Sequence, residues 1–192
     1  MNAYLLLSRT DDATDAALKD IARFSVRTTG CFAAYGALTV DSLEELRELT
    51  ERIAAIAPGD VQVRLATHTK NEALSSSGSF IPAECYDPVT GQIDWGCVGR
   101  AYPSAGLKAS YFAVAELRVD GRDDVHEKLS VTGGITGMVR LIDPNRLLIE
   151  VGARDPELLL AALDGISSVP GVTWMRTGVA TRPLDVERAE AG

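Results

Sequence analysis

The side chains best suited to chemistry lie on four stretches in which apolar and polar residues alternate. Alternation with period two is typical of a β-strand, and it places every second side chain on the same face of a sheet. In each stretch, one of the two faces carries charged or aromatic residues. The ligand-binding residues predicted on this basis are Arg64, His68, Glu116, Glu150, Trp174 and Arg176.

Two kinds of chemistry fit this set of side chains. The planar fork of an arginine binds a carboxylate through two parallel hydrogen bonds, so the set could clamp a carboxylate-bearing ligand. A carboxylate beside His68 could also form an acid/base pair. The alternative is that all these groups are rim charges paired across two sheets, and a shift of one residue in strand register would reverse every assignment.

Histidines and cysteines do not form a recognisable metal site. The spacing C-x11-C of Cys85 and Cys97, with His68 and His126 far away in the sequence, matches no zinc-ligand pattern. We therefore expect no metal and no other cofactor. We interpret Cys85 and Cys97 as ordinary buried thiols, with a disulfide between them as the alternative. Cys31 begins an expected strand and is predicted to lie in the core.

Composition restricts the class of protein and its partners. The chain has 192 residues, 46% of them hydrophobic, and a net charge of −8, which is ordinary for a globular protein. The negative charge argues against nucleic-acid binding, which needs clustered Lys and Arg. No apolar run is long enough for a membrane helix, the first residues do not resemble a signal peptide, and three cysteines are too few for a disulfide scaffold. We expect a cytoplasmic protein that binds neither nucleic acid nor membrane.

Two segments with the same pattern must position the candidate residues. Residues 41–70 and 155–182 each begin with an aspartate suited to capping a helix, Asp41 and Asp155, and continue as an amphipathic helix. Each helix ends at a Pro-Gly pair and is followed by an alternating strand. A repeat of this kind indicates two copies of one supersecondary unit.

The remaining elements extend this repeat to the order β-α-β-β-α-β in both halves, with Thr29-Gly30 as the turn between the second and third strands. This order is the ferredoxin-like pattern. The sequence therefore predicts an α+β fold of tandem ferredoxin-like units, which form a pseudo-dimeric α/β barrel or sandwich within one chain. The expected parts are a first unit over 1–70, an irregular insert or linker packing on the body over 71–109, a second unit over 110–183 and a tail over 184–192.

The segments DSLEELRELTERIAAIAPGDVQVRLATHTK and DPELLLAALDGISSVPGVTWMRTGVATRP resemble the ligand-binding (RAM) domain of the Lrp/AsnC family. The resemblance implies the βαββαβ fold, and it implies binding of an amino acid or another small effector near the interface between paired domains. Family regulators carry a helix-turn-helix before the first strand, which we do not expect in this chain. The Gly-Asp-Tyr-Asp type of turn common in the family is replaced by Asp143-Pro144-Asn145 and Thr29-Gly30.

Two functions follow from these observations. The first is binding of a small molecule, an amino acid or small carboxylate, by a protein without its own DNA-binding domain. The alternative is an enzyme of the dimeric α/β-barrel type with a biosynthetic role, with its active site between the two sheets and the 71–109 insert as its lid. Self-association into a homo-oligomer is a further expectation.

Overall fold

The computed structural model describes residues 1–67, 111–130, 132, 134–153 and 155–182. The predicted insert and tail, and with them His68, Cys85 and Cys97, lie outside the described residues. The first half consists of β1 (Asn2–Leu7), α1 (Asp12–Ile21), β2 (Phe24–Gly30), β3 (Ala34–Thr39), α2 (Leu43–Ala54) and β4 (Val61–Leu65). The second half consists of β5 (Tyr111–Val119), α5 (Arg122–Ser130), β6 (Ile135–Arg140), β7 (Arg146–Ala153), α6 (Pro156–Ser167) and β8 (Val172–Ala180).

The strands form one antiparallel sheet of eight, in the order β4-β1-β3-β2-β8-β5-β7-β6. In each half the strands lie side by side in the order fourth, first, third, second, and the halves meet where β2 pairs with β8. The two ends of the sheet also meet, because Ala66 forms a bridge with Leu141 and the N–H of Ile142 donates to the carbonyl of Leu65 at 2.9 Å. The predicted α+β class and the βαββαβ order of both halves are confirmed.

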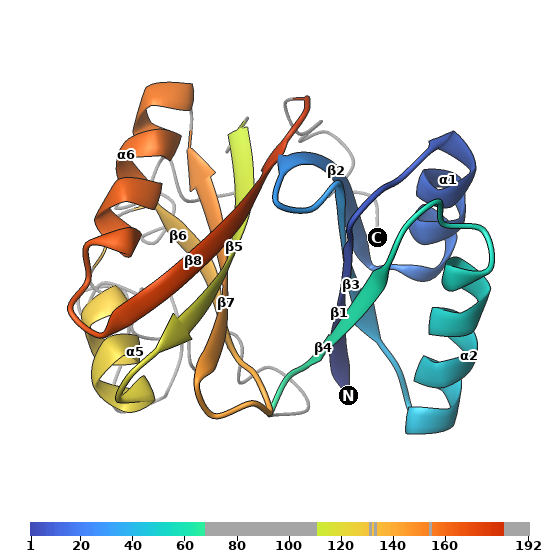
Figure 1. Ribbon diagram of the computed structural model, residues 1–192, viewed down its shortest axis with the longest axis horizontal. Helices are drawn as coiled ribbons and strands as arrows, with labels where there is room; N and C mark the ends of the chain where they lie inside the picture. The colour runs from blue at the N-terminus through green and yellow to red at the C-terminus, as the bar shows by residue number, and fades with distance from the viewer. Residues whose placement is uncertain (68–110, 131, 133, 154, 183–192) are drawn as a thin grey trace, which may run out of the picture.

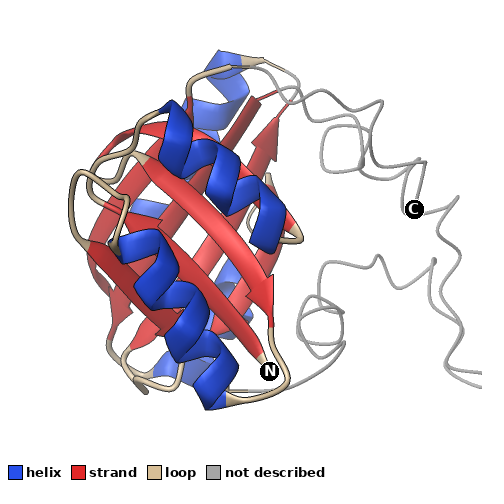
Figure 2. Ribbon diagram, turned by 90° about the vertical axis from the view of Figure 1, so that its right-hand side faces the viewer, coloured by secondary structure: helices blue, strands red, loops and turns tan. Residues whose placement is uncertain are grey.

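The helices lie outside and the strands face each other across the centre of the molecule (Figures 1 and 2). Helices α1 and α2 cover one half of the sheet, and α5 and α6 cover the other (Figure 1). A third apolar cluster joins the halves, with Tyr4 and Tyr35 from the first packed with Val114 and Leu148 from the second. The sheet face turned away from the helices is therefore covered by the other half, as predicted. None of the helices within the described ranges is long and apolar enough to cross a membrane.

Of the two predicted helix caps, Asp155 is right and Asp41 is wrong. Asp11 and Asp155 accept hydrogen bonds from backbone N–H groups in the first turns of α1 and α6. Helix α2 is capped by Ser42, whose hydroxyl accepts from the N–H of Glu45 at 3.1 Å. Asp41 lies one residue before this cap, where its own N–H donates to the Glu45 carboxylate.

The predictions for Thr29-Gly30 and Cys31 are both wrong. Strand β2 continues through Gly30, because this end of the strand pairs with β8 and Gly30 lies opposite Gly178. Gly30 has a φ of +125°, and a Cβ there would lie 2.6 Å from the carbonyl oxygen of Thr177, so the close contact requires glycine. Cys31 lies in the turn that follows and is exposed, while its neighbour Phe32 enters the core.

Candidate functional site

The inward faces of four strands bring polar side chains together between the two halves of the chain. The predicted orientation of β4 is confirmed, because Val61, Val63 and Leu65 pack on the side of the helices and Arg64 points the opposite way. The same alternation turns one face of β5, β7 and β8 inward. The residues that meet are Gln62 and Arg64 of β4, Glu116 of β5, Arg146 of β7 and Arg176 of β8.

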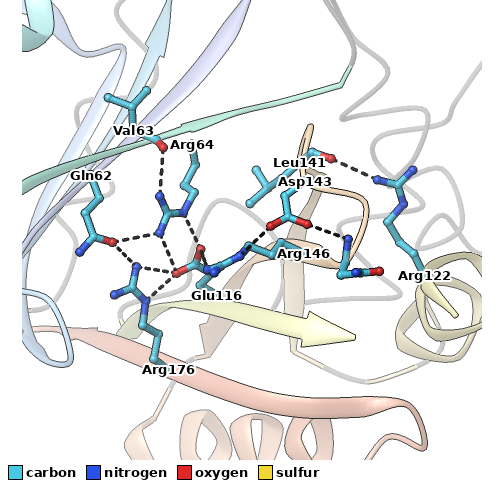
Figure 3. Close-up of polar contacts among 10 residues, drawn as sticks. Gln62, Val63, Arg64, Glu116, Arg122, Leu141, Asp143, Arg146 and Arg176 are labelled. Carbon is cyan, nitrogen blue, oxygen red and sulfur yellow. Dashed lines mark hydrogen bonds and ion pairs between the residues drawn. The ribbon is translucent and has the colours of Figure 1, made fainter. Parts of the chain in front are cut away.

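Glu116 is the centre of this arginine cluster, which we define as Arg64, Arg146, Arg176 and Glu116 (Figure 3). The Nε of Arg64 donates to Oε1 of Glu116 at 2.5 Å, and Nη1 of Arg146 donates to the same oxygen at 2.9 Å. The Nε of Arg176 donates to Oε2 at 2.5 Å. Glu116 is fully buried, whereas the arginine side chains keep 17% to 24% of their surface exposed. The arginines therefore separate the carboxylate from solvent.

Gln62 and Asp143 complete the network around the cluster (Figure 3). The Oε1 of Gln62 accepts from Nη2 of Arg64 at 2.9 Å and from Nη2 of Arg176 at 2.6 Å, which ties two guanidinium groups together. Asp143, with half of its side chain exposed, accepts from Nε of Arg146 at 3.0 Å. Three positive charges thus meet one buried and one exposed negative charge, and the site keeps an excess of positive charge.

The cluster also fixes the charge state of Glu116. Burial on its own would raise the pKa of this carboxyl, because it penalises the charged form. The hydrogen bonds and charges of the three arginines outweigh burial, so the pKa of Glu116 is lowered. Glu116 is therefore ionised at neutral pH and holds the guanidinium groups in place.

Trp174 lies beside the cluster on the inward face of β8. The guanidinium carbon of Arg176 is 5.7 Å from the Trp174 ring centroid and 5.9 Å from that of Phe32, so the cation lies within cation–π range of both rings. Phe32 is buried, but Trp174 is 44% exposed. An aromatic surface next to the arginine cluster is thus open to solvent.

Glu150 belongs to a second polar group in the interior. The hydroxyl of Tyr35 donates to Oε1 of Glu150 at 2.6 Å, and the Tyr35 ring stacks on Tyr4. Burial raises the pKa of Glu150, with the Tyr35 hydrogen bond and the charge of Arg23 acting in the opposite direction. No arginine of the cluster contacts Glu150 among the described residues, so this carboxyl responds to a different environment from that of Glu116.

The structure thus divides the predicted ligand-binding set. Arg64, Glu116, Trp174 and Arg176 lie together, Glu150 lies apart with Tyr35, and His68 lies outside the described residues. Two participants were missing from the predicted set, Gln62 and Arg146. Both could have been predicted from the sequence, because each alternates with the apolar residues of its strand. Gln62 therefore shares a face with Arg64, and Arg146 shares a face with Glu150.

The described residues offer no evident place for a metal ion. Within those ranges, no three His, Cys, Asp or Glu side chains gather closely enough to hold one. His126 is buried in α5, and its Nε2 has no hydrogen-bond partner among the residues that the structure describes. Burial lowers the pKa of His126, helped by the charge of Arg140.

Comparison with known proteins gives similarity at the level of the fold. No protein-family model and no curated protein sequence matches the chain. The solved structure of the siroheme decarboxylase NirDL is similar with a TM-score of 0.56 at 14% identity, over 95% of this chain and 72% of that one. Its complex with an iron-uroporphyrin III analogue gives the same TM-score and coverage at 15% identity.

An anthrone oxidase-like protein shares 10% identity at a TM-score of 0.44, over 95% of this chain and 90% of that one. The similarity to NirDL extends over nearly the whole of this chain. The chain therefore shares the fold of that structure, an α+β arrangement built here from two βαββαβ units.

Proposed function

We propose that the protein binds a small anionic molecule, an amino acid or another small carboxylate, at the arginine cluster. The observation that carries this proposal is the convergence of Arg64, Arg146 and Arg176 on the single buried carboxylate of Glu116. Even with the exposed Asp143, two carboxylates cannot neutralise three guanidinium groups. The excess positive charge lies on partly exposed side chains of a chain whose net charge is −8, so it marks a specific place for an anion.

The hydrogen bonds within the cluster leave donors for a ligand. The Nη2 group of Arg146 and the Nη1 group of Arg176 take part in no hydrogen bond within the described part of the chain. Guanidinium N–H groups bind carboxylates in a planar, bidentate geometry. Because Glu116 and Gln62 already hold these side chains, binding would cost little additional ordering of the site.

We further propose that the chain is a tandem pseudo-dimer that resembles an Lrp/AsnC effector domain. The identical strand order of the two halves supports this proposal. So does the position of the cluster, because Arg64 comes from the first half while Glu116, Arg146 and Arg176 come from the second. In the family that the sequence resembles, small effectors bind near interfaces between such units. The cytoplasm and a homo-oligomeric state are part of the same proposal.

Titration calorimetry with a panel of amino acids and small carboxylates tests the binding proposal. The panel includes an iron porphyrin, because a structural neighbour was solved with an iron-uroporphyrin III analogue. We expect at least one carboxylate to bind, and we expect Arg146→Gln to weaken it about 10-fold or more by removing a charged partner. Arg47→Gln is the matched control, since it removes the same charge from an ion pair on the exposed side of α2. Equal affinity in both variants, or a porphyrin as the only ligand, would reject the proposal.

An enzyme is the second candidate, favoured by the Tyr35–Glu150 pair. A carboxyl with a raised pKa beside a tyrosine hydroxyl, on the inward face of the strands, is suited to proton transfer. The predicted lid over 71–109 lies outside the described residues. Each ligand found by calorimetry would be incubated with the protein and followed by mass spectrometry. Turnover that Glu150→Gln abolishes while binding persists would establish this candidate, and unchanged ligand would exclude it.

A further inference from the structure

A second row of side chains lies beside the cluster on the same face of the sheet. Arg118 follows Glu116 by two positions along β5, so both side chains belong to the inward face. In the strand pairing, Arg118 lies opposite Trp174 of β8 on one side and opposite Arg146 of β7 on the other. The row Trp174, Arg118, Arg146 therefore runs across three adjacent strands, next to the row that contains Glu116.

Arg118 is the arginine of this row that makes no ion pair among the described residues. It is exposed, and no hydrogen bond or ion pair holds its guanidinium within the described ranges. Its charge acts on Asp143, whose pKa is lowered first by the backbone N–H of Asn145 and then also by Arg146 and Arg118. Because Arg118 and Arg146 are directly paired on adjacent strands, both side chains lie on the same side of the sheet.

Trp174 gives the row an apolar surface. With 44% of its area exposed, the indole leaves a substantial part of a large aromatic side chain in water. Aromatic rings gain stability by stacking on another ring beyond the gain from area alone. A guanidinium group and an exposed indole in adjacent positions are complementary to a molecule that carries an anionic group on a planar ring.

We propose that this row selects aromatic carboxylates, with the ligand ring against Trp174 and its carboxylate bound by Arg118 and Arg146. The inference rests on the proposed anion-binding function and narrows the ligand class from small carboxylates in general. It also assigns a binding role to Arg118 and a specificity-determining role to Trp174.

Three probes of the same carbon number separate these contributions: benzoate, cyclohexanecarboxylate and benzamide. Their dissociation constants are measured by ligand-observed NMR on the full chain. We expect benzoate to bind about 2- to 10-fold more tightly than cyclohexanecarboxylate, from stacking on Trp174. Benzamide, which lacks the charge, should bind far more weakly than either.

Three variants test which side chain produces the preference for benzoate and which binds the carboxylate. Trp174→Leu should abolish the preference for benzoate and leave the affinity for cyclohexanecarboxylate unchanged, whereas Trp174→Phe should retain part of the preference. Arg118→Gln should weaken both carboxylates by a similar factor. Circular dichroism verifies that each variant is folded, as expected for substitutions at exposed positions.

The possible results separate the inference from the function on which it rests. If no carboxylate binds, both fail. If benzoate and cyclohexanecarboxylate bind equally, or if the preference survives in Trp174→Leu, anion binding stands and the aromatic selectivity is rejected.

Discussion

Replacing Glu116 with glutamine is the most informative perturbation of the fold, because this carboxylate joins the two halves. The substitution keeps the size of the side chain and removes its charge. Hydrogen bonds to charged groups contribute about 1.5–3 kcal/mol each, and breaking a buried ion pair costs about 3–5 kcal/mol. The arginines retain 17% to 24% exposure and can be partly rehydrated. We therefore expect a net loss of about 2–4 kcal/mol in the free energy of unfolding.

Urea unfolding at pH 7, followed by circular dichroism, measures this loss. We expect a lower midpoint at an unchanged slope, because the surface exposed on unfolding stays the same. Asp123→Asn is the matched control, since it removes a carboxylate from an ion pair in which Asp123 is 80% exposed, and it should change the midpoint little. Equal stability of Glu116→Gln and the natural chain would refute the claim that the cluster links the halves.

The pH dependence provides a second test of the same residue. The pKa of Glu116 in the folded protein lies below its ordinary value of 4.5. Its ion pairs therefore contribute fully above about pH 5 and are lost as the pH falls through the folded-state pKa. The difference in stability between the natural chain and Glu116→Gln should be constant near neutral pH and should shrink in acid. A difference that grows in acid would contradict the lowered pKa.

The remaining predictions concern the interior between the halves. Tyr35→Phe removes the hydrogen bond to Glu150 and should cost about 1–2 kcal/mol in urea unfolding, whereas an unchanged midpoint would show that the bond contributes nothing. Burial raises the pKa of Glu150, so the natural chain should lose stability as the pH rises from 4.5 through the folded-state pKa. Glu150→Gln should lack this loss, and parallel pH profiles would contradict it. Gly178→Ala should destabilise by about 1–3 kcal/mol, because its Cβ would lie 2.4 Å from the buried Phe32 ring. Gly165→Ala, on α6 with only ordinary contacts, is the control and should not destabilise.

Sequence alternation was sufficient to predict which side chains face inward. In a strand, the face of each side chain follows directly from its position in the chain, so Arg64, Glu116 and Arg176 could be assigned without knowing their partners. The same argument places Arg146 on the inward face of its strand, so its omission from the predicted ligand-binding set was an error. The βαββαβ order was predictable because the helix and strand periods differ clearly.

The contacts between inward-facing residues depend on the strand register between segments that are distant in the chain. A local sequence pattern does not contain this information. Glu116 and Glu150 have equivalent local patterns, yet one contacts three arginines and the other contacts Tyr35. The length of β2 likewise depends on its pairing with β8, about 150 positions away in the chain. Thr29-Gly30, a pair of a type common in turns, therefore lies at the end of strand β2.

The most direct test of anion binding at the arginine cluster is a benzoate titration followed through the arginine Nε–H signals in ¹⁵N-resolved NMR spectra. The Nε groups of Arg146 and Arg176 donate to carboxylates in the free protein, so their signals should be protected from exchange with water. We predict that both signals shift in a saturable manner with one dissociation constant, while the signal of Arg47 on α2 does not move. Equal, unsaturable shifts of all three signals would contradict a specific site.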